Sequence, residues 1–280
     1  MIRISAFADE ISPDLNEQAD VLLSEEIHWM DFRSAWGINV LSLSDEQLVT
    51  VKQTLDANGI GVAAIGSPIG KVPIDTPFDE YLSLFERALT VARVLDTRYI
   101  RIFSFYRPAD PAASSDPASY RDEVLRRMRE MTARACAADI ILIHENEQKI
   151  YGDTIARCVD LYESVNDVHL RAVLDPANYL NCGQTPYPDA YEAVLPWLEY
   201  MHVKDVSSDG RLVVAGEGAA RWPDLLRRLQ DDGYNGFLAL EPHLHLNAAD
   251  QQHGLSNAAL FRQASQALQQ LLRVLDWEYA

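Results

Sequence analysis

The sequence predicts an α/β fold, a single (β/α)8 TIM barrel domain spanning residues 1–280. Short apolar runs alternate with longer stretches of helical period, which is typical of parallel strands joined by crossover helices. There are eight such runs, and eight strands close a barrel. A doubly wound open sheet is the main alternative. The predicted strands are IRISAF (2–7), HWMDF (28–32), GVAAIG (61–66), YIRIF (99–103), IILIH (140–144), RAVLD (171–175), YMHVK (200–204) and FLALE (237–241).

The predicted helices carry start and stop signals. Ser12–Pro13 and Asp116–Pro117 each place a capping side chain and a first-turn proline ahead of an amphipathic stretch. Ser44 and Gln47 have the spacing of a capping box, and Asn58–Gly59 marks the end of the same helix. Because each helix has one apolar face, we expect it to cover the sheet with that face only.

Composition and charge limit the classes of function. The 280 residues are 48% hydrophobic, enough for one large core, and 42 acidic against 24 basic side chains give a net charge of −18. Such a surface repels a phosphate backbone, so no nucleic acid partner is expected. Neither a signal peptide nor an apolar run of about 18–20 residues is visible, which predicts no membrane association. Three cysteines without CxxC spacing favour a cytoplasmic protein: Cys136, Cys158 and Cys182.

Residues 107–120, RPADPAASSDPASY, form the longest segment biased toward Pro, Ala, Ser and Asp. The segment follows the fourth predicted strand, so we expect it at the carboxyl face of the barrel. A lid over a site and a solvated loop are equally good interpretations of it.

Four consecutive predicted strands end in side chains that can ionise or bind a metal. Glu145, Asp175, His202 and Glu241 occupy these ends, and the carboxyl ends of barrel strands share one mouth. Two carboxylates about 4 Å apart repel by roughly 4 kcal/mol at an effective dielectric constant of 20, so three of them need a neutralising partner. Protonation is one remedy, because clustered acids raise each other's pKa. A divalent cation is the better remedy, because a neutral imidazole nitrogen is a metal ligand.

The donor set indicates which ion would bind. Three carboxylates and one imidazole suit Mn2+, Mg2+, Co2+ or Zn2+, and the oxygen majority favours the harder Mn2+. Taken singly, each residue is better explained as a helix cap or a solvated loop residue. Because four of them share one kind of position on successive strands, the metal site is the stronger hypothesis.

In these segments the chain resembles the sugar phosphate isomerase and epimerase superfamily, the xylose-isomerase-like barrels. The resemblance covers most of the chain and is strongest in ILIHENE (141–147), LDPAN (174–178), MHVKD (201–205), GEGAARWPDLL (216–226) and GYNGFLALEPH (233–243). It implies one divalent metal ion held by Glu145, Asp175, His202 and Glu241. It also implies that Glu145 and Glu241 serve as acid and base, which move a proton between neighbouring carbons of a small carbohydrate through an enediolate.

Residues near the predicted mouth are candidates for substrate binding. Lys204 can donate to a substrate oxygen or pair with Asp205. Glu217 lies between two glycines in a loop, where a plain turn is the simpler interpretation. Trp36 and Phe105 can form an apolar wall for a sugar face or serve packing alone.

Other charged residues bear on the ligand set and on the substrate. Glu147 shares a strand face with Glu145 and is the next candidate ligand. Whether the substrate is phosphorylated depends on where four basic residues lie relative to the mouth: Lys71, Arg107, Lys149 and Arg211. Of these, Arg211 is expected at the surface.

The sequence departs from the keto-sugar 3-epimerases of that superfamily at two places. Asn178 stands three residues after the aspartate ligand, where those enzymes usually carry a histidine, and it is a candidate substrate contact. Ser207, Ser208 and Asp209 occupy a stretch in which they place an arginine. These differences weaken an assignment to any single epimerase.

Three other functions compete with isomerisation. The superfamily extends to endonuclease IV type repair enzymes, whose three-metal site uses histidines from the first half, but this chain has none between His28 and His144. A metal-dependent lyase such as an inosose dehydratase is the main alternative, because proton abstraction beside a carbonyl also leads to loss of water. A non-catalytic sugar or metal binder is the third. The sequence leaves the substrate and the oligomeric state open, so a homo-oligomer is compatible with it.

Overall fold

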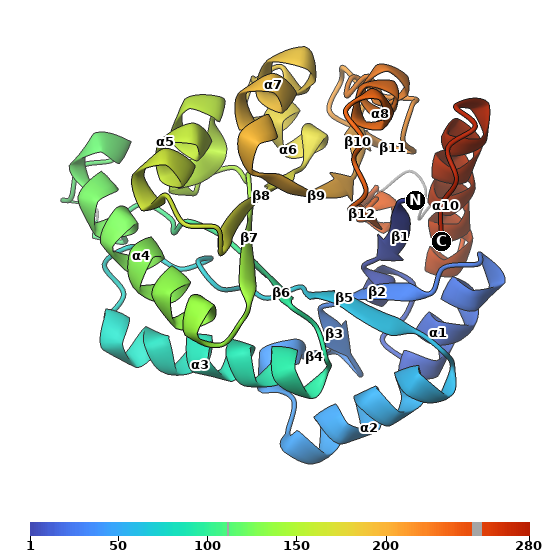
Figure 1. Ribbon diagram of the computed structural model, residues 1–280, viewed down its shortest axis with the longest axis horizontal. Coiled ribbons are helices and arrows are strands. Elements are labelled where there is room, and N and C mark those ends of the chain that lie inside the picture. Colours follow the sequence, from blue (N-terminus) through green and yellow to red (C-terminus); the bar gives the residue numbers. More distant parts are fainter. Residues whose placement is uncertain (111, 248–253) are drawn as a thin grey trace.

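The computed structural model describes residues 1–110, 112–247 and 254–280. At its centre, eight parallel strands form a closed barrel in the order β1-β12-β9-β8-β7-β6-β5-β2, with helices around it (Figure 1). The predicted (β/α)8 barrel is confirmed, and the open-sheet alternative is wrong because β1 pairs with both β12 and β2. The strands are β1 Arg3–Ala6, β2 Trp29–Phe32, β5 Gly61–Ile65, β6 Tyr99–Ile102, β7 Ile141–Glu145, β8 Leu170–Leu174, β9 Leu198–Val203 and β12 Phe237–Leu240.

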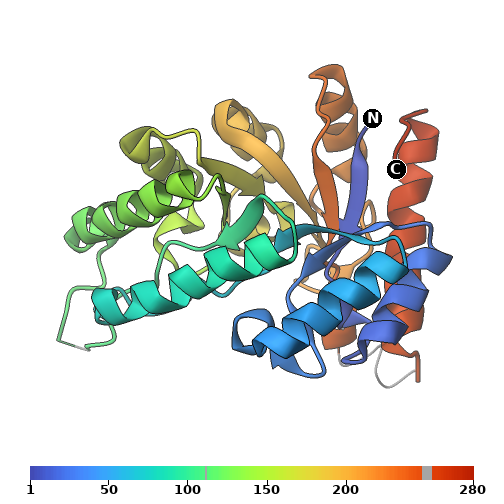
Figure 2. The same cartoon turned by 60° about the horizontal axis from the view of Figure 1, so that its bottom comes forward.

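The helices form the outer layer of the molecule, as the turned view shows (Figure 2). Two short hairpins extend from strand ends: β3 Ser34–Ala35 with β4 Ile38–Asn39, and β10 Asp205–Val206 with β11 Leu212–Val213. The α-helices are α1 Leu15–Ser24, α2 Asp45–Ala57, α3 Phe78–Val94, α4 Arg121–Ala137, α5 Ile155–Val165, α6 Pro176–Asn181, α7 Tyr191–Val194, α8 Trp222–Asp231 and α10 Asn257–Val274.

Helix ends follow local hydrogen bonding, with two corrections to the predictions. The capping box of Ser44 and Gln47 is confirmed, and α2 ends at Asn58 before Gly59 in the left-handed region. The cap of α1 is Asp14 rather than Ser12, because the Asp14 carboxylate accepts the first free N–H groups of the helix. Asp116 caps a single 3-10 turn at Pro117–Ser119, and α4 begins only at Arg121.

The barrel interior is packed beneath the polar strand ends. A buried cluster includes Ile143, Val173, Tyr200 and Ala239, which come from β7, β8, β9 and β12. Successive side chains of a strand point to opposite faces, so the residue two positions further along lies on the same face. Those residues are Glu145, Asp175, His202 and Glu241. The apolar interior therefore forms the floor beneath these four side chains.

A search of residues 1–110, 112–247 and 254–280 finds no helix with the length and apolar character needed to cross a bilayer.

Candidate metal centre

Glu145, Asp175, His202 and Glu241 meet at the carboxyl ends of their strands. Each offers one ligand atom, and these four atoms all lie within 4.8 Å of one another. All four side chains are buried, with at most 3% of each residue exposed. They converge because β7, β8, β9 and β12 are consecutive neighbours in the barrel. The structure thus brings together the four residues predicted from the strand ends.

Local hydrogen bonds hold two of the three carboxylates in place. Asp175 caps α6 by accepting the Asn178 N–H at 2.9 Å, and the Asn146 side chain bonds both the N–H and the carbonyl of Asp175 at 2.9 Å. The Asn178 amide donates to Glu145 Oε1 at 2.9 Å and to the Asn146 carbonyl at 3.0 Å. Both hydrogens of that amide are thereby used, so only its oxygen is left for a substrate.

Three cationic side chains contact the carboxylates. Lys204 Nζ lies 2.6 Å from Asp175 and 3.2 Å from Glu241. Arg101 Nη1 lies 2.9 Å from Glu145 and 3.5 Å from Glu241, and Arg33 Nη1 lies 3.0 Å from Glu241. In the absence of a metal ion, these cations balance much of the carboxylate repulsion.

The predicted pair of Lys204 with Asp205 is wrong. Lys204 points to the cluster, whereas Asp205 accepts backbone N–H groups that fold the loop after β10. Three of these donors lie well beyond Asp205 in the chain: Gly216, Gly218 and Ala220, each at 3.0 Å. Asp205 therefore shapes the rim of the site, whereas Lys204 contacts the carboxylates inside it.

Burial and neighbouring charges shift the pKa values of the cluster in different directions. Burial alone would raise the pKa of Glu145, but His202 and Arg101 together outweigh it and hold that pKa well below its ordinary value. The pKa of Glu241 is lowered in the same way by its cationic neighbours, against the effect of burial. For Asp175, burial outweighs the charge of Lys204 and raises the pKa to about 6. The carboxylates also outweigh burial at His202 and raise its pKa to about 10.

The donor set fits a divalent metal ion. His202 Nδ1 faces Glu145 at 3.4 Å and Glu241 at 3.5 Å, and neither of its ring nitrogens makes a hydrogen bond within the described part of the chain. A buried polar atom without a hydrogen bond costs about 1–3 kcal/mol, so an imidazole that faces carboxylates without a hydrogen bond fits the role of a metal ligand. Glu145, Asp175, His202 and Glu241 would be its ligands.

A second polar group, which the sequence analysis missed, borders the centre. Glu10 Oε1 lies 2.7 Å from His243 Nδ1, and His243 Nε2 lies 3.8 Å from Glu241. Arg33 joins this group through Asp9, to which its Nε donates at 2.8 Å. Glu10, Glu241 and His243 also have ligand atoms within 4.8 Å of one another.

Arg33, Arg101 and Glu10 were not predicted as site residues, although one signal was present. Arg101 interrupts the apolar run YIRIF, and a charge inside such a run must either face solvent or be paired. It is 5% exposed and paired. The Arg33 and Glu10 positions follow strand ends, but the sequence gives no sign that they meet.

The remaining predicted residues lie outside the four-residue cluster. Glu147, the next candidate ligand, instead pairs with Lys71 at 3.2 Å. Trp36 forms the turn between β3 and β4 and is 38% exposed, whereas Phe105 is fully buried and packs against Tyr81. Two others are exposed in or beside the hairpin of β10 and β11: Glu217 and Arg211. The surface position predicted for Arg211 is confirmed.

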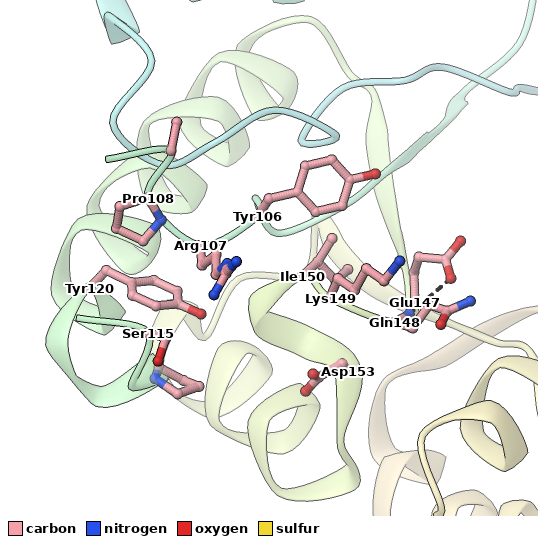
Figure 3. A pocket seen from close by; sticks show the side chains of 12 residues that line it. Tyr106, Arg107, Pro108, Ser115, Tyr120, Glu147, Gln148, Lys149, Ile150 and Asp153 are labelled. Carbon is pink, nitrogen blue, oxygen red and sulfur yellow. Dashed lines mark hydrogen bonds between the residues drawn. The ribbon is translucent and has the colours of Figure 1, made fainter. Parts of the chain in front are cut away.

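A cavity of about 920 Å3 lies between the loops that follow β6 and β7 (Figure 3). Arg107 and Lys149 line it, and neither has a hydrogen bond or ion pair with another described residue. None of the four clustered residues lines this cavity. The predicted lid segment 107–120 forms part of its wall, with position 111 outside the described residues, so a lid over the metal centre itself stays a prediction.

A sequence model of the family described as xylose isomerase-like TIM barrel matches residues 26–271. The chain belongs to the xylose isomerase-like TIM barrel family. This match covers most of the chain, and it includes all four clustered residues and the loops around them. The resemblance drawn from the strand-end motifs is thereby confirmed.

Relatives within the xylose isomerase-like barrels have more than one activity. The chain is 23% identical over 269 residues to a D-psicose 3-epimerase from Enterocloster bolteae, covering 86% of this chain and 87% of that protein. It is 20% identical over 236 residues to a 3-dehydroshikimate dehydratase from Bacillus anthracis, covering 77% of this chain and 81% of that one.

Solved structures share the barrel fold of this chain. The IolI protein with a bound zinc atom matches with a TM-score of 0.78 at 14% identity, over 97% of this chain and 98% of that chain. At this level of identity the similarity shows only that the two proteins share the barrel fold. The reaction has to be argued from the site.

Proposed function

We propose that the protein is a divalent-metal-dependent isomerase or epimerase of a small sugar or sugar phosphate. Through an enediolate, an isomerase would move a proton to the neighbouring carbon, and an epimerase would return it to the opposite face of the same carbon. The observation that carries this proposal is the meeting of Glu145 and Glu241 beside His202 and Asp175. The likeness to a D-psicose 3-epimerase supports the same reaction class.

Glu145, Asp175, His202 and Glu241 would hold the ion, with Mn2+ favoured by the oxygen-rich donor set. When bound, a divalent ion supplies Lewis acidity, which polarises a carbonyl oxygen and makes the neighbouring carbon-bound proton more acidic. The identity of the ion belongs to this proposal, and Mg2+, Co2+ and Zn2+ are the alternatives.

Each glutamate turns its two oxygens to different neighbours. Glu145 presents Oε1 to His202 at 3.4 Å and Oε2 to Arg101 at 2.9 Å. Glu241 presents Oε2 to His202 at 3.5 Å and Oε1 to Arg101 at 3.5 Å. One oxygen of each residue can therefore serve as a ligand, while the other is left to take or return a proton. We assign the acid and base roles to this pair.

The four predicted substrate contacts differ in how close they lie to the cluster. Lys204 is buried beside Asp175 and Glu241, where its ammonium can meet a substrate oxygen. Asn178 contributes chiefly by positioning Glu145. Trp36 and Glu217 lie on rim loops, and their contact with substrate stays a prediction.

A metal-dependent dehydratase is the second candidate. Two observations favour it: the likeness to a 3-dehydroshikimate dehydratase, and Asn178 at a position where keto-sugar 3-epimerases usually carry histidine. The same proton abstraction would be followed by departure of a β-hydroxyl group as water, so the two reactions share their first step.

Proton exchange with solvent tests both candidates. The Mn2+-loaded protein is incubated in D2O with keto sugars, their phosphates, hydroxypyruvate and a keto-inositol, and deuterium at carbon is followed by NMR. We expect exchange with at least one compound, accompanied by epimer or isomer formation rather than by loss of water. No exchange with any member would overturn the proposal.

Substitution of the two glutamates separates catalysis from binding. Glu145→Gln and Glu241→Gln should each lower the exchange rate by about 10^2–10^4 and change substrate affinity far less. Glu163→Gln, an exposed change on α5, serves as the matched control. Changes confined to affinity would identify a non-catalytic binder.

The expected context of the protein follows from its sequence. A small carbohydrate is the proposed partner, the net charge of −18 argues against nucleic acid, and a cytoplasmic location stays a prediction from the cysteine pattern. All three cysteines are free thiols.

A further inference from the structure

Arg101 lies inside the barrel between the two proposed catalytic glutamates. Its Nη1 donates to Glu145 at 2.9 Å and lies 3.5 Å from Glu241. The contacts go to Oε2 of Glu145 and Oε1 of Glu241, the oxygens that face away from His202. A substrate that lies between the two glutamates must therefore lie against Arg101.

Aromatic rings flank the guanidinium group of Arg101. Its Cζ atom is 4.7 Å from the centre of the Phe103 ring and 5.2 Å from the centre of the Phe7 ring. Such contacts stabilise a cation and shield it from water. The polar interactions of Arg101 are consequently restricted to the edges of its plane.

One of those edges has no partner. Nε of Arg101 is buried and makes no hydrogen bond with any described residue, and its Nη2 makes none either. Two arginines elsewhere in the structure, each through its Nε and Nη2, bind both oxygens of one carboxylate: Arg121 those of Asp160 and Arg126 those of Glu123. On Arg101 the equivalent edge is unused.

Arg33, the neighbouring arginine of the site, differs from Arg101 because carboxylates engage all of its side-chain nitrogens. Its Nε donates to Asp9 at 2.8 Å, its Nη2 lies 3.6 Å from Glu10 and its Nη1 donates to Glu241 at 3.0 Å. Protein carboxylates thus occupy every part of Arg33. An arginine cannot lose its charge, and a buried donor without an acceptor is unfavourable, so the unused edge of Arg101 calls for an acceptor from outside the chain.

We infer that Arg101 is a substrate-binding residue whose Nε and Nη2 edge receives a carboxylate, and that the substrate is a polyhydroxylated carboxylic acid rather than a neutral ketose. Two coplanar oxygens match the fork of a guanidinium group and bind it with two parallel charge-assisted hydrogen bonds. The inference rests on the proposed function for the placement of substrate between the glutamates, but its test measures binding without turnover.

Calorimetric titration of the Mn2+-loaded protein provides the test. D-glycerate, glycerol and inorganic phosphate are the probes, and each is titrated into the wild-type protein, Arg101→Gln and Arg101→Lys. We expect at least a tenfold loss of glycerate affinity in both variants, because neither side chain offers the planar two-donor edge. Glycerol binding should change by less than twofold.

Titration of the metal alone separates loss of a contact from loss of structure. Removing the charge in Arg101→Gln takes away a cation that repels the ion, so Mn2+ should bind as tightly as in the wild type or more tightly. Arg101→Lys keeps the charge and serves if the glutamine variant fails to fold. Arg127→Gln, a change at a buried arginine on α4 that pairs with Glu123, should alter neither affinity.

The results distinguish this inference from the proposed reaction. Unchanged glycerate affinity in well-folded Arg101 variants would overturn the inference, even if proton exchange with ketoses were observed. Phosphate that loses affinity in parallel with glycerate, and binds more tightly than it, would overturn the choice of carboxylate. Arg101-dependent glycerate binding without proton exchange on any substrate would sustain the inference and remove the proposed reaction.

Discussion

At the scale of single residues, the centre combines strongly opposed charges in a space closed to water. Asp175 and Glu241 share Lys204, which is 4% exposed, while Arg101 spans Glu145 and Glu241. Burial lowers the pKa of an amine, yet the carboxylates around Lys204 raise its pKa well above the ordinary value. The ammonium is therefore a permanent charge of the site.

Replacing Lys204 by methionine should destabilise the metal-free protein by about 3–5 kcal/mol, because two buried carboxylates lose their partner. With Mn2+ bound the loss should be smaller, since the ion replaces the missing positive charge. Urea unfolding in EDTA and in Mn2+ measures both values. Lys52→Met, which removes an exposed i,i+4 pair with Asp56, should cost less than about 1 kcal/mol in either condition.

Asp31 places a further ionisable group in the barrel interior. Burial raises its pKa to about 6 from 3.8, although the Tyr200 hydroxyl donates to its carboxylate at 2.9 Å. The folded protein thus binds a proton that the unfolded chain releases between about pH 4 and pH 6. Its carboxyl group reduces stability progressively as the pH rises through that window, by roughly 3 kcal/mol at most.

Asp31→Asn should consequently stabilise the metal-free protein most above pH 6 and least near pH 4. The amide oxygen can still accept the Tyr200 hydrogen bond, so the change removes only the ionisation. Chemical unfolding of both proteins in EDTA from pH 4.5 to pH 8 gives the difference. A gain that stays constant across this range would contradict the assignment of the pKa to burial.

Residue-scale prediction from sequence succeeded for the four strand ends and failed for their cationic partners. Glu145, Asp175, His202 and Glu241 share one position relative to a strand, and a barrel brings such positions together. Arg101 lies within its strand, where sequence alone does not say which face points inward. Arg33 depends on a loop conformation that no local pattern encodes.

At the scale of elements, the short helix α6 orders the centre. Its cap is the Asp175 carboxylate and its first residue is Pro176, so the ligand position and the helix start are one feature. Asn178 lies on the same first turn and reaches Glu145 on the neighbouring strand. A local capping signal in LDPAN thereby fixes the relative position of two proposed ligands.

Asn178→Ala should lower Mn2+ affinity by about 10–100-fold, the usual effect of losing a residue that orients a ligand. Titration calorimetry measures the affinity, and unfolding in EDTA measures the accompanying loss of stability. Gln269→Ala removes a buried amide of α10 that donates to the Glu25 carbonyl at 2.8 Å, so it should cost stability without changing Mn2+ affinity. Equal Mn2+ affinities in the wild type and Asn178→Ala would exclude a positioning role.

The loops after β6 and β7 bear on the phosphate question. Arg107 and Lys149 line their shared cavity without partners, whereas Lys71 is engaged by Glu147 and Arg211 is exposed elsewhere. If the substrate is phosphorylated, the double variant Arg107→Gln with Lys149→Gln should raise KM at least tenfold for the phosphate ester alone. Arg211→Gln, which removes one exposed positive charge outside this cavity, is the control, and no difference between the variants would place the phosphate elsewhere.

Element prediction was strong for strands and weaker for helix starts. Every predicted apolar run overlaps one barrel strand, and its ends differ from those of the strand by at most two residues. Ser12 and Asp14 are both good caps two residues apart, and only the three-dimensional path of the chain selects Asp14. Local sequence propensity predicts that a helix is present, whereas tertiary packing determines its first residue.

On the scale of the whole molecule, the barrel closes where the two ends of the chain meet. The Ala280 N–H donates to the Ile2 carbonyl at 3.0 Å, and the Ile4 N–H donates to the Ala280 carbonyl at 3.0 Å. Both contacts lie at the start of β1, whereas the metal centre lies at the opposite, carboxyl ends of the strands. The contacts between the chain ends and the four-residue cluster therefore lie at opposite ends of the barrel.

Deleting Tyr279 and Ala280 should lower the free energy of unfolding by about 1–3 kcal/mol, because the Ile2 carbonyl and the Ile4 N–H lose their partners. Mn2+ affinity should stay within twofold of the wild-type value. Thermal unfolding and metal titration of the shortened protein check the two statements. A large change in metal affinity would mean that the two ends of the barrel are coupled.

Because its two chain ends are adjacent, the protein could also be circularly permuted. A short glycine-rich peptide joining Ala280 to Met1 would bridge neighbours that already touch, as their positions in Figure 1 illustrate. The polypeptide could then be opened at an exposed connection such as residues 207–211, giving a circular permutant with the same barrel. Tethered to a support through the joining peptide, the protein would turn the candidate metal centre toward solution.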